Sequence, residues 1–285
     1  MLLREASSGI EVLMTRRHEK LAFMGGLWVF PGGTLRPEDA SQRTLARIAD
    51  HADAPCLRLR TLNGASLTTQ ECLGLMVAAC RETFEETGVL LAVDARGHSC
   101  PVETFARLQS ERASVAADPQ HFAIMLEREQ LWLDAGRLVY WAHWITPSSA
   151  PRRFDTRFFA LALGPGQAIA ADTTETTECR WMRPDEVVSL ARNGELPLAQ
   201  PTLCTLIDLL DSQTRNGPLQ ALLAAEAQRV VPAILPKVFS DGLLNTIIMP
   251  WDEGYAAAQG ESAPTSVEYS SFLLSQPSRR TVRRR

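Results

Sequence analysis

The sequence of 285 residues lacks several features that would each place it in a broad class of protein. No run of about 18 apolar residues occurs, so we expect no membrane-spanning helix. The formal net charge is −4, without the basic surplus that is typical of proteins that bind nucleic acid. The six cysteines form no Cys-x-x-Cys pair, which argues against a disulfide framework and against a zinc site of that kind.

The start of the chain also lacks the apolar segment of a signal peptide, because Arg4 and Glu5 follow Met1 closely. Cysteines without a pairing pattern are expected to be small buried hydrophobic residues of a protein in a reducing compartment. We therefore expect a cytoplasmic protein. Hydrophobic residues make up 45% of the chain, which is enough to bury a sizeable core.

A stretch rich in carboxylates, residues 81–89, is the most informative part of the chain. Glu82, Glu85 and Glu86 are spaced i, i+3 and i+4, so they share one face of the helix expected over residues 70–87. The opposite face is apolar and consists of Leu73, Met76, Val77, Cys80 and Phe84. Clustered carboxylates can bind a hard divalent cation. A solvated surface face is the alternative, because like charges at this spacing cost only about 0.2–0.5 kcal/mol per pair.

The rest of the sequence predicts alternating strands and helices. We expect strands at 10–15, 27–30, 138–145, 154–163 and 178–182, and helices at 40–51, 101–133 with a break at 118–119, 184 onward, 202–211 and 219–229. Thr68 or Thr69 is the expected N-cap of the carboxylate helix and Gly88 its C-cap. We expect one domain over residues 1–230, followed by a Pro-rich extension or linker over 231–285.

The order of a strand, the turn Pro31-Gly32-Gly33 and a helix with Arg-Glu-x-x-Glu-Glu-x-Gly-Val resembles the Nudix hydrolases. Their signature is GX5EX7REUXEEXGU, in which U is a bulky aliphatic residue. Arg81, Glu82, Glu85, Glu86, Gly88 and Val89 match it, and Thr83 stands at the first U. The resemblance covers residues 8–212. It implies an α/β fold, a Nudix-type α/β/α sandwich with a mixed sheet, helical insertions and an extended C-terminal tail.

The signature is split in this chain. Arg81 lies 48 positions after Gly33, where the motif has 14, which leaves about 34 inserted residues that we place within 34–70. Counted back from Arg81, the first glutamate of the motif falls on Leu73, with Glu71 or Glu38 as alternatives. A split box resembles the branch that includes the peroxisomal coenzyme A diphosphatases and their bacterial relatives, as does the segment 151–159.

The resemblance implies roles for particular residues. The catalytic set is Glu82, Arg81 and Glu85, with Glu82 orienting or deprotonating the attacking water. The metal ligands are Glu82, Glu85, Glu86 and Glu175, with Glu178 as an alternative to Glu175, and the ion is Mg²⁺ or Mn²⁺. Such a cation would neutralise a diphosphate and activate water.

A second resemblance concerns the substrate. Coenzyme A pyrophosphatases of this superfamily carry LLTXR(S/A)X3RX3GX3FPGG, and residues 13–17, Gly26 and 30–33 match at this spacing, whereas His18 and Ala22 depart from it. The implied substrate-binding residues are Arg16, Gly32, Gly33, Arg153 and Phe154.

The expected function is that of a metal-dependent hydrolase that cleaves the diphosphate bond of a nucleoside diphosphate linked to another moiety, with coenzyme A or an acyl-coenzyme A as candidate substrate. The alternatives are a nucleotide-sensing module without turnover and an ADP-ribose or dinucleotide pyrophosphatase. We expect a small nucleotide-type substrate as partner and neither nucleic acid nor membrane. Assembly as a homodimer is left open.

Overall fold

The fold is built around a mixed β-sheet. The computed structural model describes residues 1–49, 58–240, 244–262 and 280–283. In this part of the chain the main sheet has seven strands in the order β3-β2-β1-β7-β6-β9, and β8 also pairs with β2. The strands are β1 (Leu2–Ala6), β2 (Gly9–Arg17), β3 (Trp28–Val29), β6 (Val139–Ile145), β7 (Asp155–Ala162), β8 (Thr176–Met182) and β9 (Ala233–Ile234). The pairs β1–β7 and β6–β9 are parallel, and the other pairs are antiparallel.

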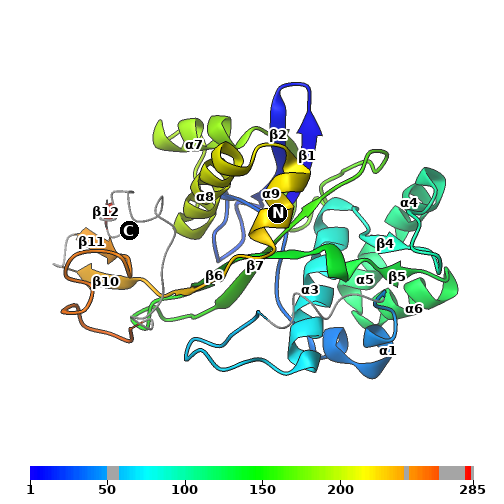
Figure 1. The fold of residues 1–285 in the computed structure, drawn as a ribbon, viewed down its shortest axis with the longest axis horizontal. Coiled ribbons are helices and arrows are strands. Elements are labelled where there is room, and N and C mark those ends of the chain that lie inside the picture. The colour runs from blue at the N-terminus through cyan, green and yellow to red at the C-terminus, as the bar shows by residue number, and fades with distance from the viewer. Residues whose placement is uncertain (50–57, 241–243, 263–279, 284–285) are drawn as a thin grey trace.

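Helices cover both faces of this sheet (Figure 1). One face packs against α7 (Pro184–Arg192), α8 (Gln200–Asn216) and α9 (Leu219–Glu226). The other face packs against α3 (Thr69–Thr87), the longest helix in the described part of the chain. Alternating residues of β2 serve the two sides, because Leu13 belongs to the core under α3 and Met14 to the core under α8. The arrangement confirms the predicted α/β/α sandwich with a mixed sheet.

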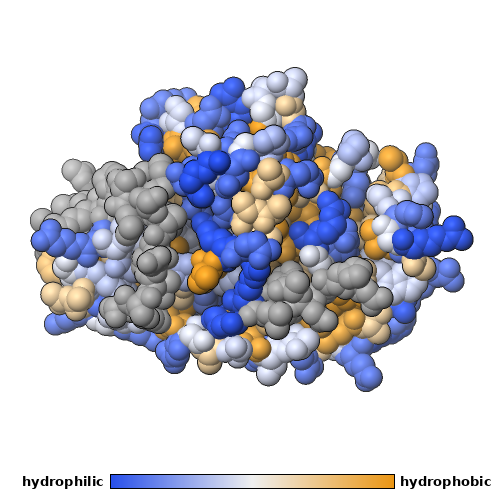
Figure 2. Space-filling model, in the orientation of Figure 1, coloured by the Kyte–Doolittle hydropathy of each residue, from blue (hydrophilic) through white to orange (hydrophobic). Residues whose placement is uncertain are grey.

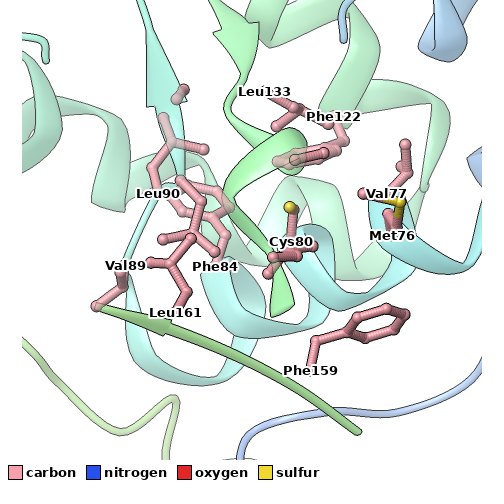
Figure 3. Close-up of a cluster of buried hydrophobic side chains, with 14 of the residues drawn as sticks. Met76, Val77, Cys80, Phe84, Val89, Leu90, Phe122, Leu133, Phe159 and Leu161 are labelled. Carbon is pink, nitrogen blue, oxygen red and sulfur yellow. The ribbon is translucent and has the colours of Figure 1, made fainter. Parts of the chain in front are cut away.

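Helix α3 is specified locally by its ends and by its apolar face. Thr68 is the N-cap, and its Oγ1 accepts a hydrogen bond from the N–H of Glu71 at 3.2 Å, while the Glu71 carboxylate accepts one from the N–H of Thr68. Gly88 ends the helix with φ of 76°, a left-handed conformation that glycine adopts without strain. The apolar side chains of Cys80 and Phe84 point into the core that α3 shares with the sheet (Figure 3).

Smaller elements surround α3 on the side away from the sheet (Figure 1). They are η1 (Pro37–Ala40), α1 (Gln42–Leu45), β4 (Ala92–Val93), α4 (Val102–Leu108), η2 (Gln109–Glu111), α5 (Arg112–Ala117), α6 (Gln120–Arg128), β5 (Trp132–Leu133) and η3 (Ala135–Arg137). The predicted break at 118–119 separates α5 from α6. Helix α1 is shorter than the expected 40–51, and the last two residues of that range lie outside the described residues.

The chain beyond residue 230 contributes to the main sheet and to a second one. Strand β9 pairs with β6 through Ala233 and Ile234. Strands β10 (Lys237–Ser240), β11 (Leu244–Ile248) and β12 (Arg280–Arg283) form an antiparallel sheet at the end of the molecule opposite to α4 (Figure 1). The division into residues 1–230 and 231–285 stays a prediction.

Hydrophilic residues predominate on the face shown in Figure 2, with hydrophobic residues scattered among them in small groups. Among the described residues, no helix is both long and apolar enough to cross a membrane.

Candidate active site

The carboxylate face of α3 is buried. Glu82, Glu85 and Glu86 are only 8%, 8% and 4% exposed. A face that merely carried solvated charge would remain open to water, so the surface interpretation of this pattern is wrong. Buried carboxylates require hydrogen bonds or a cation to offset the loss of hydration.

Arg81 supplies part of that compensation. Its side chain is fully buried, and Nη1 donates to Glu82 Oε1 at 3.0 Å and to Glu85 Oε1 at 2.9 Å. On the other side, Nε and Nη2 donate to the two carboxylate oxygens of Asp39 at 2.7 and 2.9 Å, in the bidentate geometry that a guanidinium favours. Burial opposes the charge on Arg81, but these hydrogen bonds and negative charges outweigh it and raise its pKa.

Asp39 is the acidic partner that the sequence prediction missed. Neither of the proposed substitutes takes this role, because Glu71 caps α3 and the pair with Arg81 is made by Asp39 and not by Glu38. The motif places its first glutamate six residues after its glycine, and six residues after Gly33 is Asp39. Counting forward from the glycine finds this residue, whereas counting back from the arginine crosses the insertion and misses it.

Thr34 and Asp39 therefore contact the site directly, although both fall within the range predicted for the insertion. The carbonyl of Thr34 accepts a hydrogen bond from Arg81 Nη2 at 2.9 Å, and η1 presents Asp39 to the same guanidinium. The extra length accordingly begins after Asp39.

The turn that includes Gly32 and Gly33 donates backbone hydrogen bonds to two of the glutamates. The N–H of Gly32 donates to Glu86 Oε2 at 3.0 Å, and the N–H of Thr34 donates to Glu82 Oε1 at 3.0 Å. A Cβ on Gly33 would overlap the carboxylate of Glu82. Glycine is needed here because the backbone passes so close to that side chain.

Glu86 is the least compensated of the three carboxylates. Burial is the dominant influence and raises the pKa of Glu86 to about 8, although the hydrogen bond from Gly32 opposes this shift. The negative charges of Glu82 and Asp172 raise the same pKa, and the positive charge of Arg17 lowers it. The charges of Asp172 and Arg17 therefore act on this carboxylate, and neither residue is among the predicted site residues.

The donor chemistry of this site fits a divalent cation. Three carboxylates are buried at one end of α3, burial raises the pKa of two of them, Glu85 and Glu86, and a cation would supply the missing compensation. The described residues nevertheless contain no group of three His, Cys, Asp or Glu side chains already arranged to hold a metal ion. Glu82 and Glu85 are bound to Arg81, while Glu86 is bound to Gly32.

The two candidates for an additional ligand are placed differently. Glu175 is exposed, and its main chain is held by Asp172 Oδ1, which accepts hydrogen bonds from the N–H groups of Thr174, Glu175 and Thr176. The alternative, Glu178, pairs with Arg16 at 3.1 Å and also with Arg180.

The predicted substrate-binding arginine also has other partners. Arg16 pairs with Glu178 and, at 2.9 Å, with Glu19. Its neighbour Arg17 is the residue whose charge acts on Glu86, and Arg17 Nε is buried without a hydrogen-bond partner among the described residues. In the second motif, the arginine stands at position 17.

Arg153 and Phe154 lie in the connection between β6 and β7. Arg153 donates to the carbonyl of Thr146 at 3.2 Å and pairs with Glu261 at 2.7 Å. The ring of Phe154 lies 4.7 Å from that of Phe23, measured between centroids. These contacts join the connection to the loop before β3 and leave the role of both residues a prediction.

A hollow of about 520 Å³ lies elsewhere on α3. Its lining is Gln42, Leu45, Ala46, Thr69, Gln70 and Leu73. The lining belongs to α1 and the first turns of α3, whereas the glutamates lie in the last turns, roughly 20 Å away at 1.5 Å per residue. This hollow is therefore not the carboxylate site.

Comparison with known proteins relates this site to a family. The family model of the NUDT19 Nudix domain matches residues 4–209. The acyl-coenzyme A diphosphatase NUDT19 of Homo sapiens is 28% identical over 280 residues, which covers 87% of this chain and 73% of the human protein. The protein of the same name from Xenopus laevis is 26% identical over 278 residues and covers 87% of this chain and 72% of its own.

A solved structure has the same fold. The crystal structure of a NUDIX hydrolase from Alicyclobacillus acidocaldarius aligns with a TM-score of 0.58 and 25% sequence identity. The alignment covers 78% of this chain and 92% of the other.

Proposed function

The chain belongs to the NUDT19 Nudix domain family and is a Nudix hydrolase, and on this premise we propose that it cleaves the diphosphate bond of coenzyme A or an acyl-coenzyme A. The observation that carries the proposal is the burial of Glu82, Glu85 and Glu86 beside the turn at Gly32 and Gly33. A module that only senses a nucleotide has no need for such a costly set of buried carboxylates. The names of the human and Xenopus relatives support the choice of substrate.

Nudix hydrolases generally use divalent metal ions, and we propose Mg²⁺ or Mn²⁺ for this chain. Glu82, Glu85 and Glu86 would hold the ion, and Glu175 stays a predicted further ligand. When bound, such an ion neutralises charge on the diphosphate and activates water. The carboxyl of Glu86 must ionise to act as a ligand, so the ion is expected to displace its proton.

The protein's own residues would prepare the site for hydrolysis. Arg81 holds Glu82 and Glu85 in fixed rotamers, and the bidentate pair with Asp39 fixes Arg81 in turn. Glu82 Oε1 is held by two donors, from Thr34 and Arg81, and this carboxylate is the proposed acceptor of the proton from the attacking water. The water oxygen bonds to one phosphorus as the bridging P–O bond breaks.

Arg17 is the candidate for binding the diphosphate itself. The Arg17 side chain is partly buried, its charge acts on Glu86, and its Nε has no hydrogen-bond partner within the described part of the chain. A phosphate oxygen would satisfy that donor through a charge-assisted hydrogen bond. Arg16, with two carboxylates of its own, is less suited to this role.

The proposal is tested by a substrate panel. Purified protein is assayed with Mg²⁺ or Mn²⁺ against coenzyme A, an acyl-coenzyme A, ADP-ribose, NADH and dinucleoside polyphosphates, and the products are separated by chromatography. We expect the coenzyme A compounds to be cleaved fastest, and we expect Glu86→Gln to be inactive. Glu103→Gln, at an exposed position on α4, is the matched control.

The outcomes separate the candidate functions. Faster cleavage of ADP-ribose or of a dinucleotide would refute only the substrate. No turnover of any compound, or equal turnover by Glu86→Gln, would refute the hydrolase mechanism for this site. Cytoplasmic location, the absence of nucleic acid as a partner and homodimer formation stay predictions.

A further inference from the structure

The last turn of α3 is held by groups that come from outside the Nudix signature. The final carbonyls of a helix have no partner within it and carry partial negative charge. In α3 this end also bears the side chains of Glu85 and Glu86. A positive group at this position would stabilise both the helix end and its carboxylates.

Arg112 is such a group. It begins α5, and its Nε and Nη2 both donate to the carbonyl oxygen of Glu85, at 3.1 and 2.8 Å. The positive charge of Arg112 also interacts with the carboxylates of Glu86 and Asp172. Two N–H groups of a planar guanidinium that bind the same carbonyl fix the position of that carbonyl more firmly than a single donor does.

Neighbouring contacts fix the same end of the helix. The N–H of Ala170 donates to the carbonyl of Thr87 at 3.0 Å. Gln109 packs its side-chain amide against Gly88 and donates to the carbonyl of Ala168 at 2.8 Å. Helix α5 and the loop before β8 therefore both bind backbone carbonyls of the last turn of α3, those of Glu85 and Thr87.

We propose that Arg112 is a positioning residue of the hydrolase, which fixes the last turn of α3 so that Glu85 and Glu86 are aimed at the metal ion. The backbone of this turn sets the directions of both Cα–Cβ bonds, and ligand sites need their groups held within about 0.5 Å. The inference rests on the proposed function, because it concerns the same site. It assigns a role to the helical segment 102–128, which the signature does not include.

The test uses two variants. Arg112→Gln keeps an aliphatic stem but loses the positive charge and the paired N–H donors of the guanidinium. Arg112→Lys keeps the positive charge but replaces the guanidinium with an ammonium group. Arg107→Ala is the matched control, since Arg107 is an exposed arginine on α4 whose partner is Glu129. Four quantities are measured: Mn²⁺ affinity by electron paramagnetic resonance without substrate, amide hydrogen exchange over residues 84–90 in the metal-free protein, and both kcat and KM for coenzyme A.

For Arg112→Gln we expect Mn²⁺ to bind about tenfold more weakly, kcat to fall about tenfold or more and KM to change by less than about threefold. Amide exchange should accelerate over 84–90 and stay unchanged over 72–80. Arg112→Lys should lie between wild type and Arg112→Gln, and added guanidinium ion should restore part of the Mn²⁺ affinity of Arg112→Gln. The control should match wild type in all four quantities.

Two results would overturn the inference. Unchanged Mn²⁺ affinity and unchanged exchange over 84–90 in the folded variants would show that Arg112 positions nothing. A large rise in KM with unchanged kcat would show that Arg112 contacts the substrate. If Arg112→Gln does not fold, the same readouts on Arg112→Lys decide. If the wild type hydrolyses no compound, the proposed substrate fails, whereas Mn²⁺ binding and amide exchange still test Arg112.

Discussion

The buried carboxyl of Glu86 predicts an unusual dependence of stability on pH in the metal-free protein. Its pKa is raised from the ordinary 4.5 to about 8 by burial, so the folded state keeps a proton that the unfolded chain has already released. A carboxyl of this kind makes the folded state less favourable as pH rises through the interval between the two pKa values. The substitution Glu86→Gln removes the titration while retaining an oxygen that can accept the hydrogen bond from Gly32.

The size of the effect follows from the shift. Each pKa unit corresponds to 1.36 kcal/mol, so ionisation of the unfolded chain lowers the wild-type free energy of unfolding by about 1 kcal/mol at pH 5 and by about 4 kcal/mol at pH 8. Relative to wild type, Glu86→Gln should therefore gain about 3 kcal/mol between these two values. Above pH 8 the gain should level off, because the carboxyl is then ionised in both states.

Urea unfolding in the presence of a chelator measures this difference at pH 5, 6, 7 and 8 by linear extrapolation. Glu103→Gln, at an exposed position, should differ from wild type by the same amount at every pH. Saturating Mg²⁺ or Mn²⁺ at pH 8 should stabilise the wild type by mass action and Glu86→Gln much less. A difference between Glu86→Gln and wild type that stays constant from pH 5 to pH 8 would refute the reasoning.

Three further predictions concern other contacts of the site. Asp39→Asn removes the charge opposite Arg81 and should lower the free energy of unfolding by about 3 kcal/mol in urea, and a loss of less than about 0.5 kcal/mol would contradict a structural ion pair. Gly33→Ala should lower kcat by at least about tenfold and also lower Tm, because its Cβ would displace Glu82 from its buried hydrogen bonds, whereas Gly164→Ala, whose added Cβ meets no atom within 4 Å, should change neither. Arg17→Ala should raise KM for the diphosphate substrate by about tenfold, and an unchanged KM would exclude a phosphate contact.

The sequence was sufficient to predict those features that depend on neighbouring residues. The N-cap was predicted to within one residue, at Thr68 or Thr69, and the C-cap at Gly88, because an N-cap side chain and a left-handed C-cap act within one turn. The expected strands at 138–145 and 154–163 are β6 and β7. The carboxylate spacing placed Glu82, Glu85 and Glu86 on one helix face, but only the surrounding tertiary structure decides whether such a face is buried.

The features that could not be predicted depend on contacts between distant parts of the chain. Asp39 and Arg81 are 42 residues apart, so the residues around Arg81 in the sequence do not indicate which carboxylate pairs with it. Arg16 and Arg17 are adjacent on β2, where successive side chains point to opposite faces and the pairing with β8 shifts register. Choosing between Arg16 and Arg17 requires knowing which face of β2 is directed toward the glutamates of α3. The same limit applies to Arg112, which no motif connects with Glu85.

The separation of Asp39 from Arg81 also has an entropic consequence. In the unbroken signature the corresponding acidic residue and arginine are eight positions apart, and here the pair closes a loop of 42 residues. The free energy of closing a flexible loop grows only with the logarithm of its length, so this lengthening costs about 1.5 kcal/mol. A single buried bidentate contact is of comparable size. The chain between Asp39 and α3 can therefore be longer than in the unbroken signature while the geometry around the guanidinium is kept.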